Sequence, residues 1–224
     1  MKVALFLISA LVLAATQAHA NEQAKKYYLK VEAGGSFPTE LTDFEFYENN
    51  RPKNGAVFGF GAGYNINRYL SADASFNHFP YHKFDKTLNS GGRRIQTIRS
   101  SSLMFNMIFN VPTPYYINPF FNAGAGFAHN NAGDYVQPML GGYDPGKVKD
   151  SFAWNVGAGG SFKINEWFSP YITYKYFDLG KIQSQPYFVD LAETNPLIPN
   201  LKAAPAIKSR LRTHTTMLGL MYNF

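Results

Sequence analysis

The chain has 224 residues, of which 46% are hydrophobic, 17% aromatic and only 16% charged. This composition excludes a disordered chain, because the apolar surface is large enough to offset the entropy of ordering. The absence of cysteine excludes disulfides, thiolate metal sites and a cysteine nucleophile. The net charge of +6 arises without a run of Lys or Arg, so no nucleic-acid partner is expected.

Residues 1–20 have the pattern of a secretory signal peptide. Lys2 precedes an apolar run over residues 3–15, and Ala18-His19-Ala20 is a small-x-small cleavage pattern. The run is shorter than the roughly 20 residues that a membrane helix needs. The sequence therefore predicts a signal peptide over residues 1–20 and an exported domain over residues 21–224.

Eight segments of this domain carry apolar or aromatic side chains at every second position, which is typical of β-strands. They span residues 27–34, 56–65, 70–77, 102–111, 121–127, 152–162, 172–176 and 215–224. No later segment holds eighteen consecutive apolar residues, so no membrane helix is expected. A closed β-barrel can still cross a membrane, because its strands satisfy every backbone polar group among themselves.

The second face of these segments favours a barrel over a soluble β-sandwich. A sandwich shows water a face rich in Lys, Glu and Thr, whereas the second face here is mostly Gly, Ser and Asn, which suits a crowded lumen. The sequence predicts an all-β fold, an eight-stranded antiparallel up-and-down transmembrane barrel. Buried charges in its lumen must pair with one another or with trapped water. The candidate lumenal charges are Lys30, Glu32, Asp73, Arg99 and Lys175.

The connections between the segments alternate in length, as expected for periplasmic turns and extracellular loops. Short links span residues 65–69, 112–119 and 163–167, and long ones span residues 38–54, 80–94, 129–150 and 179–209. Aromatic residues cluster near both ends of the segments, where two interfacial belts are expected, with Phe79 assigned to the outer belt. The predicted location is the bacterial outer membrane, with the long loops at the cell surface.

The last nine residues resemble the terminal strand of outer-membrane barrels, with Leu220, Tyr222 and Phe224 at alternate places. The resemblance implies that this strand is the recognition signal for the barrel-assembly machinery. Residues 174–180 are similar to the penultimate strand of eight-stranded surface antigens related to the outer-membrane protein A barrel and to opacity proteins. Rickettsial adhesins belong to the same broad group. The resemblance covers the whole exported chain at the level of architecture.

Three chemical alternatives can be weighed from the residues. The glycines at 59, 61 and 63 and at 157, 159 and 160 do not open a helix, so they do not form a phosphate loop. His78 and His82 bracket the start of a long loop and are a candidate metal pair. His129, Asp150 and Ser151 are a candidate catalytic set without a flanking motif. The sequence predicts no enzyme, no metal and no cofactor.

The long loops are the expected seat of function, because a barrel needs only short connections. Exposed aromatics among Lys and Arg are typical of protein interfaces. The candidate ligand-binding residues are Tyr81, Lys83, Arg93, Arg94, Tyr135, Tyr143, Tyr187 and Phe188. The favoured function is an adhesin that binds host cell-surface proteins or environmental macromolecules. Simple contact with outer-membrane lipid and lipopolysaccharide, a small passive pore, and a purely structural barrel remain the alternatives.

Overall fold

The computed structural model describes residues 25–39, 49–87, 93–133, 135–137, 142–144, 147–183, 187–189, 202–204 and 208–224. The predicted signal peptide lies outside these residues. Among them there is no helix that is long and apolar enough to span a membrane.

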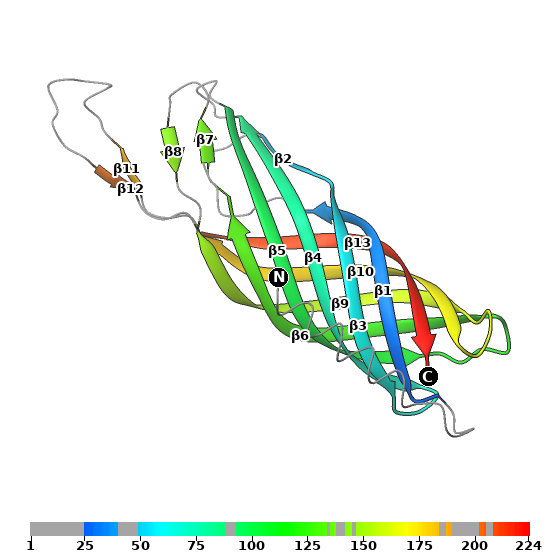
Figure 1. The fold of residues 1–224 in the computed structure, drawn as a ribbon. Helices are drawn as coiled ribbons and strands as arrows, with labels where there is room; N and C mark the ends of the chain where they lie inside the picture. Colours follow the sequence, from blue (N-terminus) through cyan, green and yellow to red (C-terminus); the bar gives the residue numbers. More distant parts are fainter. Residues whose placement is uncertain are drawn as a thin grey trace, which may run out of the picture.

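Eight long antiparallel strands form one closed wall (Figure 1). They are β1 (Tyr27–Pro38), β3 (Gly55–Asn65), β4 (Leu70–Thr87), β5 (Arg93–Asn110), β6 (Ile117–Ala132), β9 (Val148–Phe162), β10 (Phe168–Gln183) and β13 (Lys208–Asn223). Each strand pairs with the next, and β13 closes the ring by pairing with β1 from Asn223↔Tyr28 to Thr213↔Pro38. The predicted eight-stranded barrel is confirmed.

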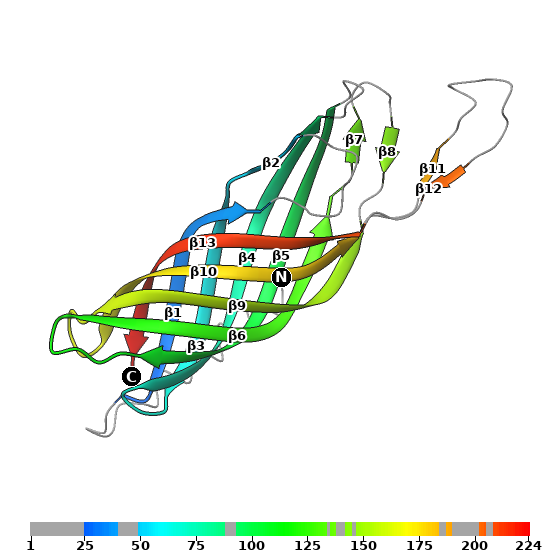
Figure 2. The ribbon, with the colours of Figure 1, turned by 180° about the vertical axis from the view of Figure 1, so that it is seen from behind.

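Five short strands lie beyond one end of this wall (Figures 1 and 2). They are β2 (Asn49–Lys53), which pairs with β4, the hairpin of β7 (Tyr135–Gln137) and β8 (Gly142–Asp144), and the pair β11 (Tyr187–Val189) and β12 (Lys202–Ala204). We call the end of the wall that carries these short strands the loop end. The opposite end, which holds Phe224 and the three short connections, is the turn end.

Asparagine side chains fix two of the short connections. The Asn67 side-chain oxygen accepts hydrogen bonds from the backbone N–H groups of Tyr69 and Leu70, at 2.8 and 2.9 Å. Asn165 does the same for Trp167 and Phe168, at 2.9 and 2.7 Å. An asparagine that caps its own turn in this way replaces missing backbone partners. These tight links hold neighbouring strands in antiparallel register.

The alternation predicted from the sequence separates an apolar exterior from a filled interior. Phe60, Phe105 and Leu220 are 50%, 59% and 41% exposed, although they come from three different strands. They therefore face outward and do not meet in a common core. The side chains at the intervening positions are buried, as in Ser71, Asp73, Ser75 and Asn77 of β4. In this part of the wall the polar residues are thus inside and the large apolar residues outside, the reverse of a water-soluble protein.

The sequence placed the second long loop too early. Most of the predicted loop 80–94 is strand, since β4 runs on to Thr87 and β5 already begins at Arg93. The register of this pair shifts between Phe79 and His82, which marks a β-bulge. A bulge interrupts the two-residue period, so the alternation ceases to be readable although the strand continues. Phe79 is a second correction: its side chain is buried in the interior and does not belong to the outer aromatic belt.

Candidate functional site

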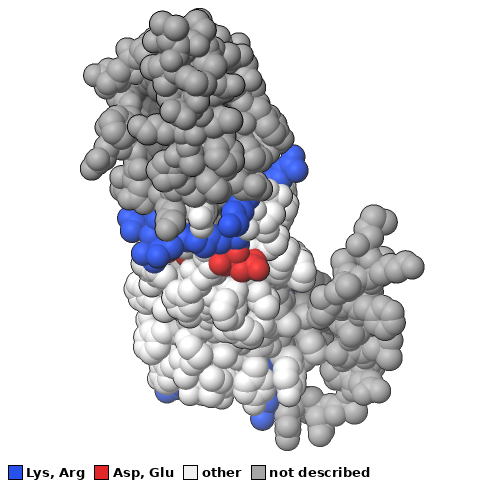
Figure 3. Space-filling model, turned by 90° about the vertical axis from the view of Figure 1, so that its left-hand side faces the viewer, with Lys and Arg blue, Asp and Glu red and all other residues white. Residues whose placement is uncertain are grey.

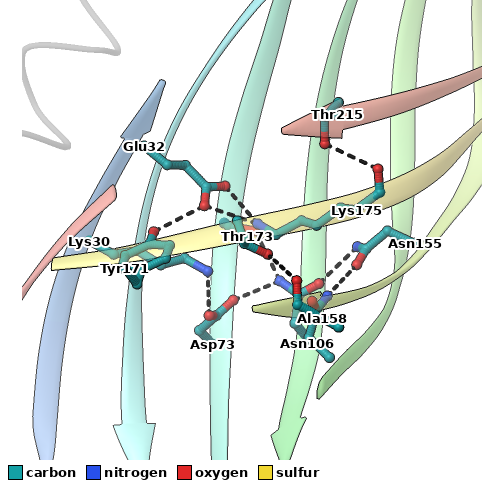
Figure 4. A network of polar contacts seen from close by, with 12 residues as sticks. Lys30, Glu32, Asp73, Asn106, Asn155, Ala158, Tyr171, Thr173, Lys175 and Thr215 are labelled. Carbon is teal, nitrogen blue, oxygen red and sulfur yellow. Dashed lines mark hydrogen bonds and ion pairs between the residues drawn. The ribbon is translucent and has the colours of Figure 1, made fainter. Parts of the chain in front are cut away.

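Two buried ion pairs cross the interior of the barrel (Figure 4). Lys30 of β1 pairs with Asp73 of β4, and the Lys175 ammonium of β10 lies 2.8 and 3.0 Å from the two carboxylate oxygens of Glu32. All four residues are at most 7% exposed. The pairs are formed between strands far apart in sequence, because the inward positions of a narrow barrel meet near its axis. A buried charge needs such a partner, since desolvation would otherwise be too costly.

Hydroxyl and amide groups complete this interior network. Tyr28 donates to Asp73 at 3.1 Å, and Tyr171 donates to Glu32 at 3.0 Å. The Asn106 amide donates to Asp73 at 2.6 Å, and the Asn155 amide donates to Asn106 at 2.8 Å (Figure 4). The Asn122 amide in turn donates to Asn155 at 2.7 Å. Connected buried polar groups stiffen a core, because each one would be left unpaired if the others moved.

The sequence placed Arg99 among the lumenal charges, and this prediction is wrong. Arg99 is exposed, whereas its neighbours Ile98 and Ser100 are buried. Successive side chains on a strand point to opposite faces, so the inward positions of β5 are the even-numbered ones that include Met104 and Asn106. The alternation within β5 therefore places Arg99 on the outer face.

Sequence reasoning missed Tyr171, although the paired strand carries a signal for it. Tyr171 lies opposite Gly219 in the register of β10 and β13, as Tyr28 lies opposite Gly63 in that of β1 and β3. A Cβ atom on Gly219 would stand 2.2 Å from the Tyr171 Cζ atom. The glycine therefore leaves the space that the buried ring occupies.

Substitution of Gly219 by alanine is expected to displace the Tyr171 ring and break its hydrogen bond to Glu32. Overpacking of this kind costs about 1–3 kcal/mol of unfolding free energy. Gly160→Ala is the matched control, because its new Cβ would meet only Ile117, at 3.5 Å. Urea unfolding of both refolded variants checks this. Equal midpoints for the two alanine variants would show that the ring is not confined.

A second layer, made of apolar side chains, fills the interior nearer the loop end. The Phe79 and Phe177 rings meet edge to face at a centroid distance of 5.5 Å. The buried cluster comprises Val57, Phe79, Phe84, Ile98, Met104, Ala128, Ala153, Phe177, Leu179, Ile182, Leu211 and Met217. None of them is more than 4% exposed. In the described part of the chain, charged and amide groups thus fill one half of the lumen. The other half holds mainly hydrocarbon, together with buried polar groups such as Ser36 and His82.

The candidate catalytic and metal sets are not assembled. His129 and Asp150 do meet at 2.7 Å on the exterior, but the hydroxyl of Ser151 donates to the Lys181 carbonyl on another strand. His78 faces Ser101 at 2.9 Å, whereas His82 is buried beside Ser36 at 2.8 Å. No group of three His, Asp or Glu side chains among the described residues has metal-ligand geometry.

The candidate ligand-binding residues all lie in strands at the loop end. Tyr81 is 48% exposed and Lys83 half-buried, both on β4. The others are described by backbone alone: Arg93 and Arg94 in β5, Tyr135 in β7, Tyr143 in β8, and Tyr187 and Phe188 in β11. Because β7 pairs with β5 at Ile95↔Val136, six of these residues lie in one sheet with the wall, whereas Tyr187 and Phe188 lie in the separate sheet of β11 and β12.

The terminal strand closes the barrel at the turn end. The backbone N–H of Phe224 donates to the Tyr27 carbonyl at 2.9 Å, and the Tyr222 ring stacks on both Phe224 and Trp167. Leu220 is 41% exposed on the outer face. The role of these residues as an assembly signal stays a prediction.

An apolar exterior around a polar, ion-paired interior defines a transmembrane β-barrel, because only hydrocarbon favours this arrangement. The family model described as the outer membrane protein beta-barrel domain matches residues 6–224. The chain belongs to this family, and its location is the bacterial outer membrane.

Solved structures agree with this fold. The chain is similar to Neisserial surface protein A, with 15% identity over 88% of this chain and 97% of that one, at a TM-score of 0.53. The outer membrane protein OprG of Pseudomonas aeruginosa is 14% identical over 89% and 97%, at 0.55. AlkL, an outer membrane protein determined in lipid bilayers, is 15% identical over 92% and 94%, at 0.53. No curated protein is a significant sequence match.

Proposed function

We propose that this barrel is a surface adhesin, which binds a host or environmental macromolecule through its loop end and carries out no catalysis. In this proposal the loop end faces away from the cell and the turn end faces the periplasm. The barrel acts as a rigid, membrane-anchored support, because binding residues are commonly carried by segments that a rigid scaffold positions.

The observation that carries the proposal is an extension of the wall by paired strands, of which β2, β4 and β5 are the longest. The hairpin of β4 and β5 runs beyond the ladder between β5 and β6, which ends at Ile98↔Ala132, and β2 adds a third strand to it. The barrel needs none of this length to close. Building a paired sheet above a membrane wall supplies a stiff surface for a partner, at a lower entropic cost of binding than a flexible loop.

Basic residues are concentrated on this extension. The register places Lys86 opposite Arg94, Thr87 opposite Arg93, and Lys83 opposite Lys53. Asp85, opposite Arg51 of β2, contributes one acidic residue. Such a surface favours an acidic macromolecule, since complementary charge raises the rate of encounter. The extension, β2 with the loop ends of β4 and β5, is thus the proposed binding surface.

Attachment of bacteria tests the proposal. The protein is displayed on a non-adherent strain, and a variant carries Lys83→Gln, Lys86→Gln, Arg93→Gln and Arg94→Gln. The matched control carries Lys25→Gln, Lys26→Gln, Arg68→Gln and Lys163→Gln at the turn end, which removes the same charge. We expect the first variant to lose attachment to host cells and the control to keep it. Unchanged attachment by the first variant, with heat-modifiable mobility intact, would contradict the proposal.

Planar-bilayer recordings address the pore alternative. Because two layers of side chains fill the interior, we expect no discrete conductance from the refolded protein. A pore would instead conduct, and its conductance would change when Lys175 or Asp73 is neutralised. Steady single-channel events that respond to those substitutions would favour the pore over a closed support.

A further inference from the structure

A cluster of charged side chains lies on the exterior of the wall where β10 meets β13 at the loop end. The carboxylate of Asp178 is 3% exposed and accepts from the Nε–H groups of Arg210 at 3.0 Å and Arg212 at 3.4 Å. The two arginine side chains are 42% and 38% exposed. The carboxylate thus forms the floor of the cluster, and the two guanidinium groups stand above it.

A β-bulge builds this cluster. The pairing of β10 with β13 shifts between Asp178↔Arg212 and Lys181↔Arg210. Gly180 within the bulge has a φ of 78°, which an L side chain rarely adopts, and its N–H donates to Asp178 at 2.9 Å. A bulge re-aims side chains relative to the regular pleat. Here the backbone itself holds the carboxylate that orients both arginines.

The cluster has more positive charge than its own carboxylate balances. Lys181 is exposed and lies directly opposite Arg210, and like charges in opposite positions destabilise a sheet. Asp150, the acidic residue on neighbouring β9, is paired with His129. Each arginine uses its Nε–H for Asp178 and carries four further N–H donors. Three cations around one carboxylate thus favour an anionic ligand.

The position of the cluster decides which anion it meets. Asp178 follows Phe168, the first residue of β10, by ten positions, and a tilted strand crosses the hydrocarbon layer in about 9–11 residues. Below the cluster, the exterior is apolar, with Ile172 45%, Tyr174 50% and Leu218 68% exposed. Figure 3 shows a band of lysine and arginine with an acidic patch directly beside it, then a largely uncharged stretch of wall, and further basic atoms at the opposite end. The cations therefore lie at the level of the lipid headgroups.

We propose that Arg210, Arg212 and Lys181 bind the phosphate of a lipid in the membrane leaflet that surrounds the loop end. Guanidinium groups suit this ligand, because they bind phosphate oxygens in pairs and are weakly hydrated. The apolar wall below contacts the acyl chains of the same lipid, and the His214 ring, packed against Tyr174 and Tyr176, lies between the two regions. This site is independent of the adhesive surface, since β1 and β3 separate β13 from β4.

Lipid binding by the detergent-purified protein tests this site. Native mass spectrometry compares bisphosphorylated lipid A with the same lipid stripped of its phosphates. We expect wild type to prefer the phosphorylated lipid by about tenfold, as one or two charge-assisted hydrogen bonds imply. Arg210→Gln/Arg212→Gln is expected to abolish the preference. Lys181→Gln, which leaves the Asp178 contacts intact, is expected to reduce it.

The control variant, Arg68→Gln/Lys163→Gln, removes the same charge at the turn end and is expected to bind like wild type. Equal binding of both lipids by wild type would overturn the proposal, as would an equal loss in the control. If the double arginine variant does not show the heat-modifiable mobility of a folded barrel, the Lys181→Gln variant provides the test. An unchanged preference of Lys181→Gln for the phosphorylated lipid would then contradict the proposed site. Millimolar pyrophosphate is expected to leave the lipid bound. Complete displacement would show that the ligand is a soluble phosphate, and would overturn the assignment to lipid.

Discussion

Replacement of Lys175 by methionine is expected to destabilise the barrel by about 3–5 kcal/mol, the usual cost of leaving a buried charge without its partner. Lys175 pairs with both oxygens of Glu32, and the two side chains are buried, at 7% and 0% exposed. After the substitution, Glu32 keeps the Tyr171 hydroxyl at 3.0 Å but loses its cation. Urea unfolding in detergent micelles, followed by tryptophan fluorescence, measures the loss.

The double variant Lys175→Met/Glu32→Gln separates the charge from the shape of the site. Removing both members of a buried pair is often close to neutral, so most of the lost stability is expected to return. The glutamine retains an oxygen that accepts from Tyr171. A single variant as stable as wild type would mean that water reaches Glu32 and that the interior is not closed.

Substitution of Phe105 by arginine tests the exterior in the same way. Phe105 is 59% exposed between Leu103 and Met107 on the outer face of β5. In water this change would cost little, because the side chain has few contacts to lose. On the lipid face near the middle of a bilayer, an arginine costs about 2–4 kcal/mol. Unfolding in lipid vesicles is expected to show that loss.

Tyr116→Arg is the matched control, because Tyr116 is 84% exposed in the turn between β5 and β6, outside the hydrocarbon layer. We expect this variant to unfold like wild type. Equal stability of the two arginine variants would mean that Phe105 faces water, and the assignment of the outer surface to lipid would be wrong.

The filled interior favours a closed barrel that anchors the surface strands over an ion-conducting pore. The ion-paired layer and the apolar layer lie one above the other, so an ion would have to displace both. Removing a buried aromatic such as Phe177 opens a cavity, but it leaves the charged layer in place. The proposed adhesive and lipid-binding surfaces both lie on the wall and its extension, where substitutions need not disturb this packing.

The eight strands of the wall, and the faces of most of their side chains, could be predicted from the residues alone. Alternation is a local property, since each side chain's face follows from its neighbours two positions away. For this reason Lys30, Glu32, Asp73 and Lys175 were assigned to the interior from sequence. Arg99 was assigned wrongly because the alternation of β5 was not continued from Asn106 back to this position.

The partners of these inward side chains could not be predicted from local pattern. Lys30 meets Asp73 43 positions away, and Glu32 meets Lys175 143 positions away, because closure of the ring brings inward positions together. The bulges at Phe79/His82 and Asp178/Lys181 could not be predicted from the sequence either. An inserted residue interrupts the two-residue alternation by which a strand is recognised. The first bulge lies where the extension begins, and the second brings Arg210 and Arg212 to Asp178. The local alternation of residues therefore predicts the strands of the wall, whereas closure of the barrel determines which side chains meet in its interior and on its surface.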